Sequence, residues 1–257
     1  MTKIGKRSLA VLAAGAMFLT SFNMPFAETE SEAAAQMTAQ ESTSAYGLSN
    51  PAVSDGVTTW DCIYFGNYWQ EDTNGDGTAD QNDEKQPIKW RVLSVDGDDA
   101  FLLADEALDC KSYNETAEEV TWETCTFREW LNGTFLDAAF STEEQSAIKT
   151  TTVVNEDNIS YAIVGGNTTS DKIFLLSQNE VINPNYGFNS VYNLDSETRQ
   201  CKASAYAIEN GCYIRNIEGY DDICWWWLRS PGYNSNGATS VDYGGWGNSI
   251  GHSVASR

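Results

Sequence analysis

The chain has 257 residues, with 15 basic and 37 acidic side chains and a formal net charge of −22. Residues 1–27 hold three of the basic residues and none of the acidic ones, so the remainder carries 12 − 37 = −25. A nucleic-acid partner requires a basic face, which this composition excludes, and the same charge disfavours binding to anionic lipid.

The first 27 residues predict a cleaved secretory signal peptide. Three basic residues precede an apolar run from Leu9 to Phe22, and Ala27 offers a small residue at the cut. The run is shorter than the roughly 20 residues of a spanning helix, which favours cleavage over a membrane anchor. No later stretch is apolar enough to span a bilayer. We therefore expect a secreted or cell-envelope protein with no membrane insertion after cleavage.

Two regions follow the signal peptide. Residues 28–57 are mainly Glu, Ala, Ser, Thr and Gln and predict a disordered acidic spacer, because they offer little apolar surface to bury. Aromatic and β-branched residues become frequent from residue 58. Residues 58–257 are long enough for one sizeable domain.

The first half of this domain predicts strands and then helices. Strands are expected over 62–69, 88–95 and 100–104, the last two joined by the hairpin signal Asp96-Gly97-Asp98. A helix is expected over 126–140, with Thr124 or Thr126 as its N-cap. The pattern Ser141-Thr-Glu-Glu predicts a capping box that opens a second, short helix.

The second half predicts a return to strands. We expect a strand over 172–176, a helix over 197–209 that ends at Asn210-Gly211, a strand over 224–228, and a hairpin of 238–243 with 249–255. Strands, then helices, then strands indicate the α+β class, with mixed, mostly antiparallel strands and two or three helices.

Residues 72–83 predict a calcium loop between the first two strands. With Asp72 at position 1, oxygen-bearing side chains fall at positions 1, 3, 5, 9 and 12, a glycine falls at position 6, and position 7 offers its carbonyl. The predicted ligands are Asp72, Asn74, Asp76, Thr78, Asp80 and Asp83. Position 12 is Asp where the EF-hand has Glu, and the flanks predict strands instead of helices. We expect a structural calcium ion, bound with a Kd on the order of 10⁻⁴–10⁻³ M. The alternative is a solvated Asx-rich turn with no ion.

Six cysteines remain after the predicted cleavage, an even number that suggests disulfides in an exported protein. The favoured pairs are Cys110 with Cys125, and one among Cys201, Cys212 and Cys224. The alternative is that some are free, buried thiols.

No catalytic constellation stands out. The single histidine, His252, is expected to be a surface residue, and zinc lacks ligands at usable spacing. The run Trp225-Trp226-Trp227 places side chains on both faces of a strand. One face is expected to be core, and the other is either a stacking surface or is covered by a second layer, which we favour slightly.

The run Trp225-Trp226-Trp227-Leu228-Arg229-Ser230-Pro231-Gly232 resembles a domain-of-unknown-function family of exported Gram-positive proteins, marked by a Trp-Trp-Leu-Arg-Ser-Pro-Gly motif. Further similar segments are Tyr64-Phe65-Gly66, Ile88-Lys89-Trp90-Arg91-Val92-Leu93, Thr126-Phe127-Arg128-Glu129-Trp130-Leu131-Asn132 and Phe174-Leu175-Leu176-Ser177. The resemblance covers most of residues 60–257.

The resemblance implies a fold similar to C-type lectins and to the sulfatase-modifying-factor domain. It also implies that Arg229 and Ser230 fix the loop after the tryptophan strand. Family members usually end in a strand like Gly-Val-Arg-Pro-Ala-Leu, which is not found before Arg257, so this chain is expected to be truncated. The sulfatase-modifying relatives are oxidases with two nearby cysteines, whereas Cys201, Cys212 and Cys224 are 212 − 201 = 11 and 224 − 212 = 12 residues apart.

These observations favour a binding module that recognises a glycan or an extracellular protein. Its contacts are expected in two C-terminal loops rich in Tyr, Trp, Ser, Gly and Asn, a composition that suits recognition. The predicted ligand-binding residues are Tyr233, Asn234, Asn236, Tyr243, Trp246 and Asn248. Two alternatives stay open, an oxidase or other enzyme on the same scaffold, and a passive envelope protein with no specific ligand.

Overall fold

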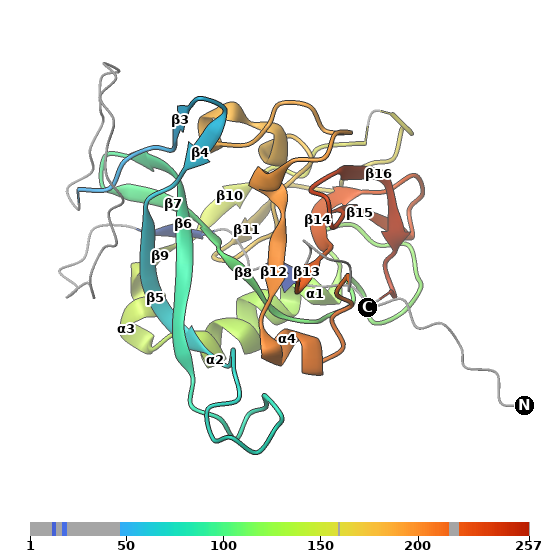
Figure 1. The fold of residues 1–257 in the computed structure, drawn as a ribbon. Coiled ribbons are helices and arrows are strands. Elements are labelled where there is room, and N and C mark those ends of the chain that lie inside the picture. Colours follow the sequence, from blue (N-terminus) through green and yellow to red (C-terminus); the bar gives the residue numbers. More distant parts are fainter. Residues whose placement is uncertain (1–11, 14–16, 20–46, 159, 216–220, 257) are drawn as a thin grey trace, which may run out of the picture.

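The structure is a computed structural model that describes residues 12–13, 17–19, 47–158, 160–215 and 221–256. It is a mixed α+β fold in which most strand pairs are antiparallel (Figure 1), as the sequence predicts. Within the described residues, no helix is long and apolar enough to cross a membrane.

The largest sheet is built on a meander of β5 (Cys62–Tyr68), β6 (Gln86–Asp96) and β7 (Asp99–Ala104). Burial alternates along β6, where Ile88 and Trp90 are fully buried and the residue between them is partly exposed. This is the pattern of a strand with one face on the core. The turn between β6 and β7 confirms the predicted hairpin.

Two short strands lie in the predicted signal peptide. β2 (Met17–Leu19) pairs with β7 and with β9 (Ile148–Lys149), and β1 (Leu12–Ala13) pairs with β8 (Glu106–Asp109). The other residues of the predicted signal lie outside the described residues, so the signal peptide stays a prediction. Its cleavage would remove both strands and leave β7 at an edge of the sheet.

A second sheet joins β8 to β12 (Cys201–Ala203) and β13 (Ile223–Cys224), with β8 and β12 parallel. The predicted helix over 197–209 is therefore wrong in its first half. It is a 3₁₀ turn, Glu197–Arg199, followed by β12, and only α4 (Ala205–Glu209) is helical. Pairing of β12 with two strands overrides local helix propensity, because tertiary contacts outweigh a weak local preference.

The third sheet is a C-terminal meander of β14 (Trp226–Pro231), β15 (Gly237–Val241) and β16 (Gly247–Ser253). It confirms the predicted final hairpin and the tryptophan strand. The strand predicted over 172–176 is wrong. The nearby strand is β11 (Thr169–Asp171), which pairs with β10 (Thr151–Val153).

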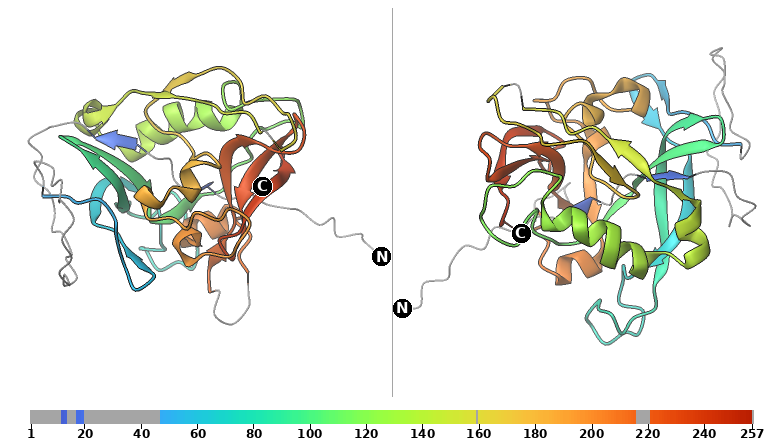
Figure 2. Two further views of the ribbon diagram at one scale, coloured as in Figure 1. Left: turned by 90° about the horizontal axis from the view of Figure 1, so that it is seen from above. Right: turned by 180° about the vertical axis from the view of Figure 1, so that it is seen from behind.

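One long helix is composed of α1 (Thr126–Trp130), a π-helical turn (Leu131–Phe135) and α2 (Leu136–Ala139), and it crosses the molecule when seen from behind (Figure 2, right). Cys125 occupies its N-cap position without a capping side chain, so the predicted threonine cap is wrong. The predicted capping box is confirmed at the start of α3 (Thr142–Ala147).

The folded region begins before residue 58. Leu48 is 4% exposed, the side-chain oxygen of Asn50 accepts from the Val95 amide at 2.7 Å, and β3 (Ala52–Ser54) pairs with β4 (Val57–Thr59). Residues 47–57 of the predicted spacer are thus ordered, and residues 28–46 lie outside the described residues.

The three tryptophans of the Trp225-Trp226-Trp227 run are all buried, which confirms that a second layer covers both faces of this segment. Trp227 packs edge-on against Trp225 with ring centroids 5.0 Å apart, while the indole of Trp226 donates to the Arg199 carbonyl at 3.0 Å. Arg229 is buried beside them. It pairs with Glu180 and donates to the carbonyls of Leu175 and Val154, so it holds the 175–180 segment in place.

Candidate functional site

The six predicted ligand-binding residues are divided between the two ends of β15. Tyr233, Asn234 and Asn236 lie in the turn before this strand, whereas Tyr243 and Trp246 lie in the turn after it. Five strand residues separate the turns by roughly 15 Å. The two C-terminal loops that the sequence predicts as binding loops therefore lie apart and do not form one site.

The turn before β15 carries an exposed aromatic pair. Tyr233 is 53% exposed and packs edge-to-face against Tyr161, which is 41% exposed, with ring centroids 6.4 Å apart. The Tyr233 amide donates to the Ile250 carbonyl at 3.0 Å, and the Ile250 side chain is also exposed. We call Tyr161, Tyr233, Asn236 and Ile250 the aromatic face.

A buried amide holds this face together. Asn158 is 2% exposed, and its Nδ2 donates to the carbonyls of Pro231 at 2.9 Å and Gly232 at 3.2 Å. Its Oδ1 accepts from the Ser160 amide, so one side chain ties the Tyr161 turn to the Tyr233 turn. Local sequence patterns cannot predict this contact, because the two tyrosines are 233 − 161 = 72 residues apart.

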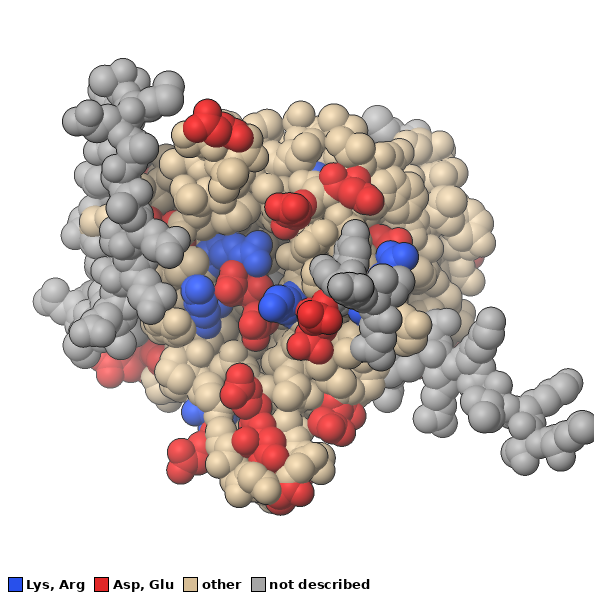
Figure 3. Space-filling model, in the orientation of Figure 1, with Lys and Arg blue, Asp and Glu red and all other residues tan. Residues whose placement is uncertain are grey.

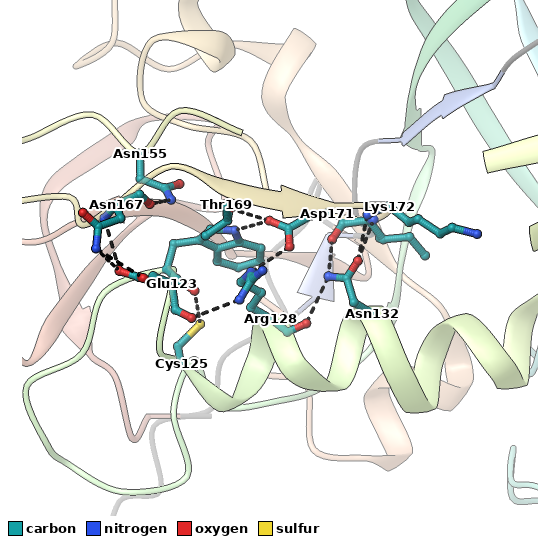
Figure 4. A network of polar contacts seen from close by, with 11 residues as sticks. Glu123, Cys125, Arg128, Asn132, Asn155, Asn167, Thr169, Asp171 and Lys172 are labelled. Carbon is teal, nitrogen blue, oxygen red and sulfur yellow. Dashed lines mark hydrogen bonds and ion pairs between the residues drawn. The ribbon is translucent and has the colours of Figure 1, made fainter. Parts of the chain in front are cut away.

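A polar network anchors the loop that carries Tyr161 (Figure 4). The carboxylate of Asp171 accepts from the Trp122 indole at 3.0 Å, from the Thr169 hydroxyl at 2.7 Å and from Arg128 Nε at 2.7 Å. Arg128 lies on α1, so the network fixes β11 against the long helix. Farther along the loop, Asn167 contacts Glu123.

Asn234 and Asn236 differ in how accessible their side chains are to a ligand. Asn236 is exposed and lies in the same turn as Tyr233. The Asn234 side-chain oxygen is buried, with no hydrogen-bond partner among the described residues, and it lies over Gly237, where an added Cβ would meet it at 2.8 Å. Of these two predicted contacts, Asn236 is therefore the more accessible to a ligand.

The residues at the other end of β15 are largely engaged in packing. Tyr243 is half-buried between Tyr213, at 6.0 Å between ring centroids, and the Arg215 guanidinium, at 5.8 Å from the ring centroid. Burial raises the pKa of Tyr243 well above its usual range. Trp246 is half-buried, and the Asn248 side chain accepts from the Gly251 amide at 3.0 Å within β16.

The predicted calcium loop projects from the fold between β5 and β6, at the foot of the view in Figure 1, where acidic side chains gather in Figure 3. Asp72 accepts from the amides of Gly75 at 2.7 Å and Gly77 at 2.8 Å. Asn74 and Asp76 each accept from the amide two residues on. The residues whose spacing predicts a calcium ion thus form a series of overlapping Asx turns in the structure.

Asp83 closes this loop instead of standing free for a ligand. Its Oδ1 accepts from the amides of Thr73 and Asn74 and from the Thr73 hydroxyl, and its Oδ2 accepts from the Asp80 amide at 2.8 Å. The amide of Asp80, followed by the other donors, lowers the pKa of Asp83. Among the described residues, no group of three or more acidic, His or Cys side chains is arranged to hold a metal ion.

All six cysteines lie in the described part of the chain, and none of them is in a disulfide there, so the predicted disulfides are not seen. The Cys125 thiol donates to the Trp122 carbonyl at 3.5 Å, and burial raises its pKa to about 12. Cys201, Cys212 and Cys224 meet in space despite their wide sequence spacing.

His252 is not the surface residue that the sequence suggests. Its ring is half-buried and lies 4.3 Å from the ring centroid of Trp225, and burial lowers its pKa. The histidine is part of the packing that covers the tryptophan strand.

Comparison with protein families places part of the chain in a known family. A family model described as a domain of unknown function, DUF6273, matches residues 97–256. No curated protein and no solved structure matches the chain. The match includes the tryptophan strand and most of the aromatic face's framework, but begins after β5 and β6. Since the match spans more than half of the sequence, the chain belongs to the DUF6273 family of domains of unknown function.

Proposed function

We propose that this protein is an extracellular or cell-envelope binding module that recognises a glycan through the aromatic face. The observation that carries the proposal is the exposed Tyr161–Tyr233 pair, built from two distant segments and held by the buried amide of Asn158. Such a framework presents rigid aromatic surface at low entropic cost, which favours affinity.

The chemistry of the face favours a sugar over other ligands. A tyrosine ring offers an apolar surface on which the C–H face of a pyranose can stack, with a hydroxyl that exchanges hydrogen bonds. The exposed Asn236 amide, in the same turn as Tyr233, adds a donor and an acceptor. The net charge of −25 outside residues 1–27 makes a neutral or cationic glycan the better partner than an anionic one. An extracellular protein is the second candidate ligand.

We expect Tyr233→Ala to weaken glycan binding at least about tenfold, since loss of a central aromatic contact costs roughly 1.4 kcal/mol or more. The measurement is an array of bacterial and host glycans, followed by calorimetry with the best-binding glycan. Tyr213→Ala is the matched control, because Tyr213 is 56% exposed and also has an aromatic neighbour, at the other end of β15.

Each outcome of this comparison has a meaning. Loss of binding in Tyr233→Ala alone supports the aromatic face. Loss in Tyr213→Ala alone moves the site to the other turn and overturns the proposal. Binding to protein ligands but to no glycan on the array overturns the choice of a sugar.

We further propose that the 72–83 loop binds one calcium ion weakly, in a structural role. Asp72, Asn74, Asp76 and the Thr78 carbonyl keep the sequence register of a calcium loop, and the side-chain oxygens of Asp80 and Asp83, like those of the first three, accept from amides of the loop. The oxygen ligands and the millimolar calcium of an extracellular setting support this proposal.

Two substitutions distinguish an effect on calcium binding from an effect on the stability of the loop. Asp76→Asn is expected to abolish the calcium-dependent rise in melting temperature and leave the melting temperature without calcium unchanged. Asp83→Asn is expected to lower the melting temperature with or without calcium, because its one remaining oxygen cannot accept both from the Thr73 and Asn74 amides and from the Asp80 amide on the other side. A wild-type protein that shows no heat and no melting shift at millimolar calcium would contradict the calcium proposal.

A further inference from the structure

Three cysteines from separate segments form one cluster around β13. Cys201 in β12 lies directly opposite Cys224 in β13. On the other side of Cys224, a bridge pairs it with Ile214. Cys212 precedes Ile214 by two residues and therefore projects to the same face of the extended chain. Cys224 thus has one thiol neighbour on each side.

The thiols are close neighbours. Burial, followed by the thiols of Cys201 and Cys212, raises the pKa of the Cys224 thiol. Its sulfur is also 3.4 Å from the Cys201 carbonyl oxygen. Cys201 is 5% exposed and Cys212 6%, whereas Cys224 has no exposed surface. The central thiol is hidden, and the two outer thiols keep a small accessible area.

Cys201 lies directly opposite Cys224, whereas Cys212, two residues before Ile214, approaches Cys224 from the diagonal position on the other side. Residues directly opposite in an antiparallel pair have Cα atoms about 4.5–5.5 Å apart, within the range of about 4.4–6.8 Å that disulfides span. Three thiols can form only one disulfide at a time. We propose that Cys201, Cys212 and Cys224 form a redox switch in which Cys224 bonds to either neighbour and the third thiol stays reduced.

The oxidant that this step needs is a low-molecular-weight disulfide such as oxidised glutathione. The thiolate of Cys201 or Cys212 attacks it, which forms a mixed disulfide and releases one reduced glutathione. Cys224 then loses its proton and attacks the protein sulfur of the mixed disulfide, which releases the second glutathione. Two S–H bonds and the glutathione S–S bond are broken, one protein S–S bond is formed, and both electrons and both protons end on glutathione.

The two disulfides constrain different parts of the chain. A Cys212–Cys224 bond closes the short segment that carries Tyr213 and Arg215, which contact the Tyr243 ring. A Cys201–Cys224 bond instead joins β12 to β13 across the sheet. Attack of the third thiolate on the existing disulfide interconverts the two forms without net oxidation. The switch acts at the end of β15 opposite the aromatic face and does not depend on the glycan proposal.

The test titrates the full chain with mixtures of reduced and oxidised glutathione, quenches in acid, alkylates the thiols and maps the peptides by mass. We expect the wild type to lose two thiols, both from the cluster, and to yield both the Cys201–Cys224 and the Cys212–Cys224 peptides. Cys212→Ser is expected to yield only the first linkage and Cys201→Ser only the second. Cys125→Ser is the matched control, because Cys125 is equally buried outside the cluster, and it should leave both linkages in place.

Two results would overturn the proposal. One is a cluster that keeps all three thiols at every glutathione ratio in which the protein remains folded by circular dichroism. The other is a single linkage in the wild type that does not change partner when the protein is incubated at alkaline pH, where thiolates form. The Ser variants of the outer cysteines keep Cys224 in place, so neither result depends on a variant in which the fully buried position is changed.

Discussion

Replacing Arg199 with leucine is expected to lower the free energy of unfolding by about 3–5 kcal/mol, a loss comparable with breaking a buried charged network. Arg199 is 1% exposed, and its guanidinium donates to main-chain carbonyls instead of to an acid. The shortest contacts are to Gly245 at 2.6 Å, Leu194 at 2.7 Å and Asn189 at 2.8 Å. Arg199 therefore holds the loop before β12 against the turn after β15.

The physical reason for this large effect is the number of acceptors that would be left unpaired. A carbonyl that loses a charged donor inside the protein keeps its desolvation cost and loses its partner. Thermal unfolding should show a fall in Tm of roughly 10 °C. Arg199→Lys keeps the charge without the planar fork, so we expect an intermediate loss.

A surface cation provides the control. Lys149 forms an ion pair with Asp99, and its side chain is 47% exposed. Exposed pairs contribute about 0–1 kcal/mol, so Lys149→Met should change stability by less than about 1 kcal/mol. An Arg199→Leu protein as stable as the Lys149→Met protein would show that the carbonyls find other donors, and that Arg199 does not organise the loop.

Local sequence patterns predict the strands and helices of this fold where local and tertiary preferences agree. The β6–β7 hairpin, the 126–140 helix and the capping box at Ser141 all have such patterns, and the structure contains each of them. The helix predicted over 197–209 failed because β12 pairs with two strands that are remote in sequence. Arg199 was placed in that helix, although its partners lie as far away as Gly245.

The candidate site was less predictable than the fold. The sequence identified Tyr233 and Asn236 from the composition of a loop, and the structure leaves both exposed. It did not identify Tyr161, which the Asn158 amide ties to the Tyr233 turn, or Ile250, whose carbonyl accepts from the Tyr233 amide. It also treated the spacing of Cys201, Cys212 and Cys224 as evidence against an oxidase of the sulfatase-modifying type, whereas sheet pairing brings the three cysteines together. The number of residues between two positions indicates their distance in space only when both lie in the same helix or strand.

The second large effect is expected at Asp171, whose replacement by asparagine should lower the free energy of unfolding by about 2–4 kcal/mol. The carboxylate is fully buried and pairs with Arg128, whose side chain is 26% exposed. Asparagine keeps the size of the side chain but removes its charge and one acceptor, so the indole, the hydroxyl and the guanidinium can no longer all be paired. Chemical denaturation of both proteins measures the difference.

A double-mutant cycle isolates the ion pair from the rest of the network. We expect a coupling energy of about 1–3 kcal/mol between Asp171→Asn and Arg128→Met, and less than about 1 kcal/mol for the exposed Asp99 and Lys149 pair. If Asp171→Asn were as stable as the wild type, the network in Figure 4 would not hold β11 against the helix.

The same substitution links stability to the proposed function. The network lies behind the loop that presents Tyr161, and a face that is held rigid binds with a smaller entropic cost. Asp171→Asn should therefore weaken glycan binding even at temperatures where the protein stays folded, although Asp171 is buried and cannot contact a ligand. Tyr213→Ala, which leaves this network untouched, should not. A variant that is destabilised yet binds with wild-type affinity would show that the aromatic face keeps its geometry without the Asp171 network.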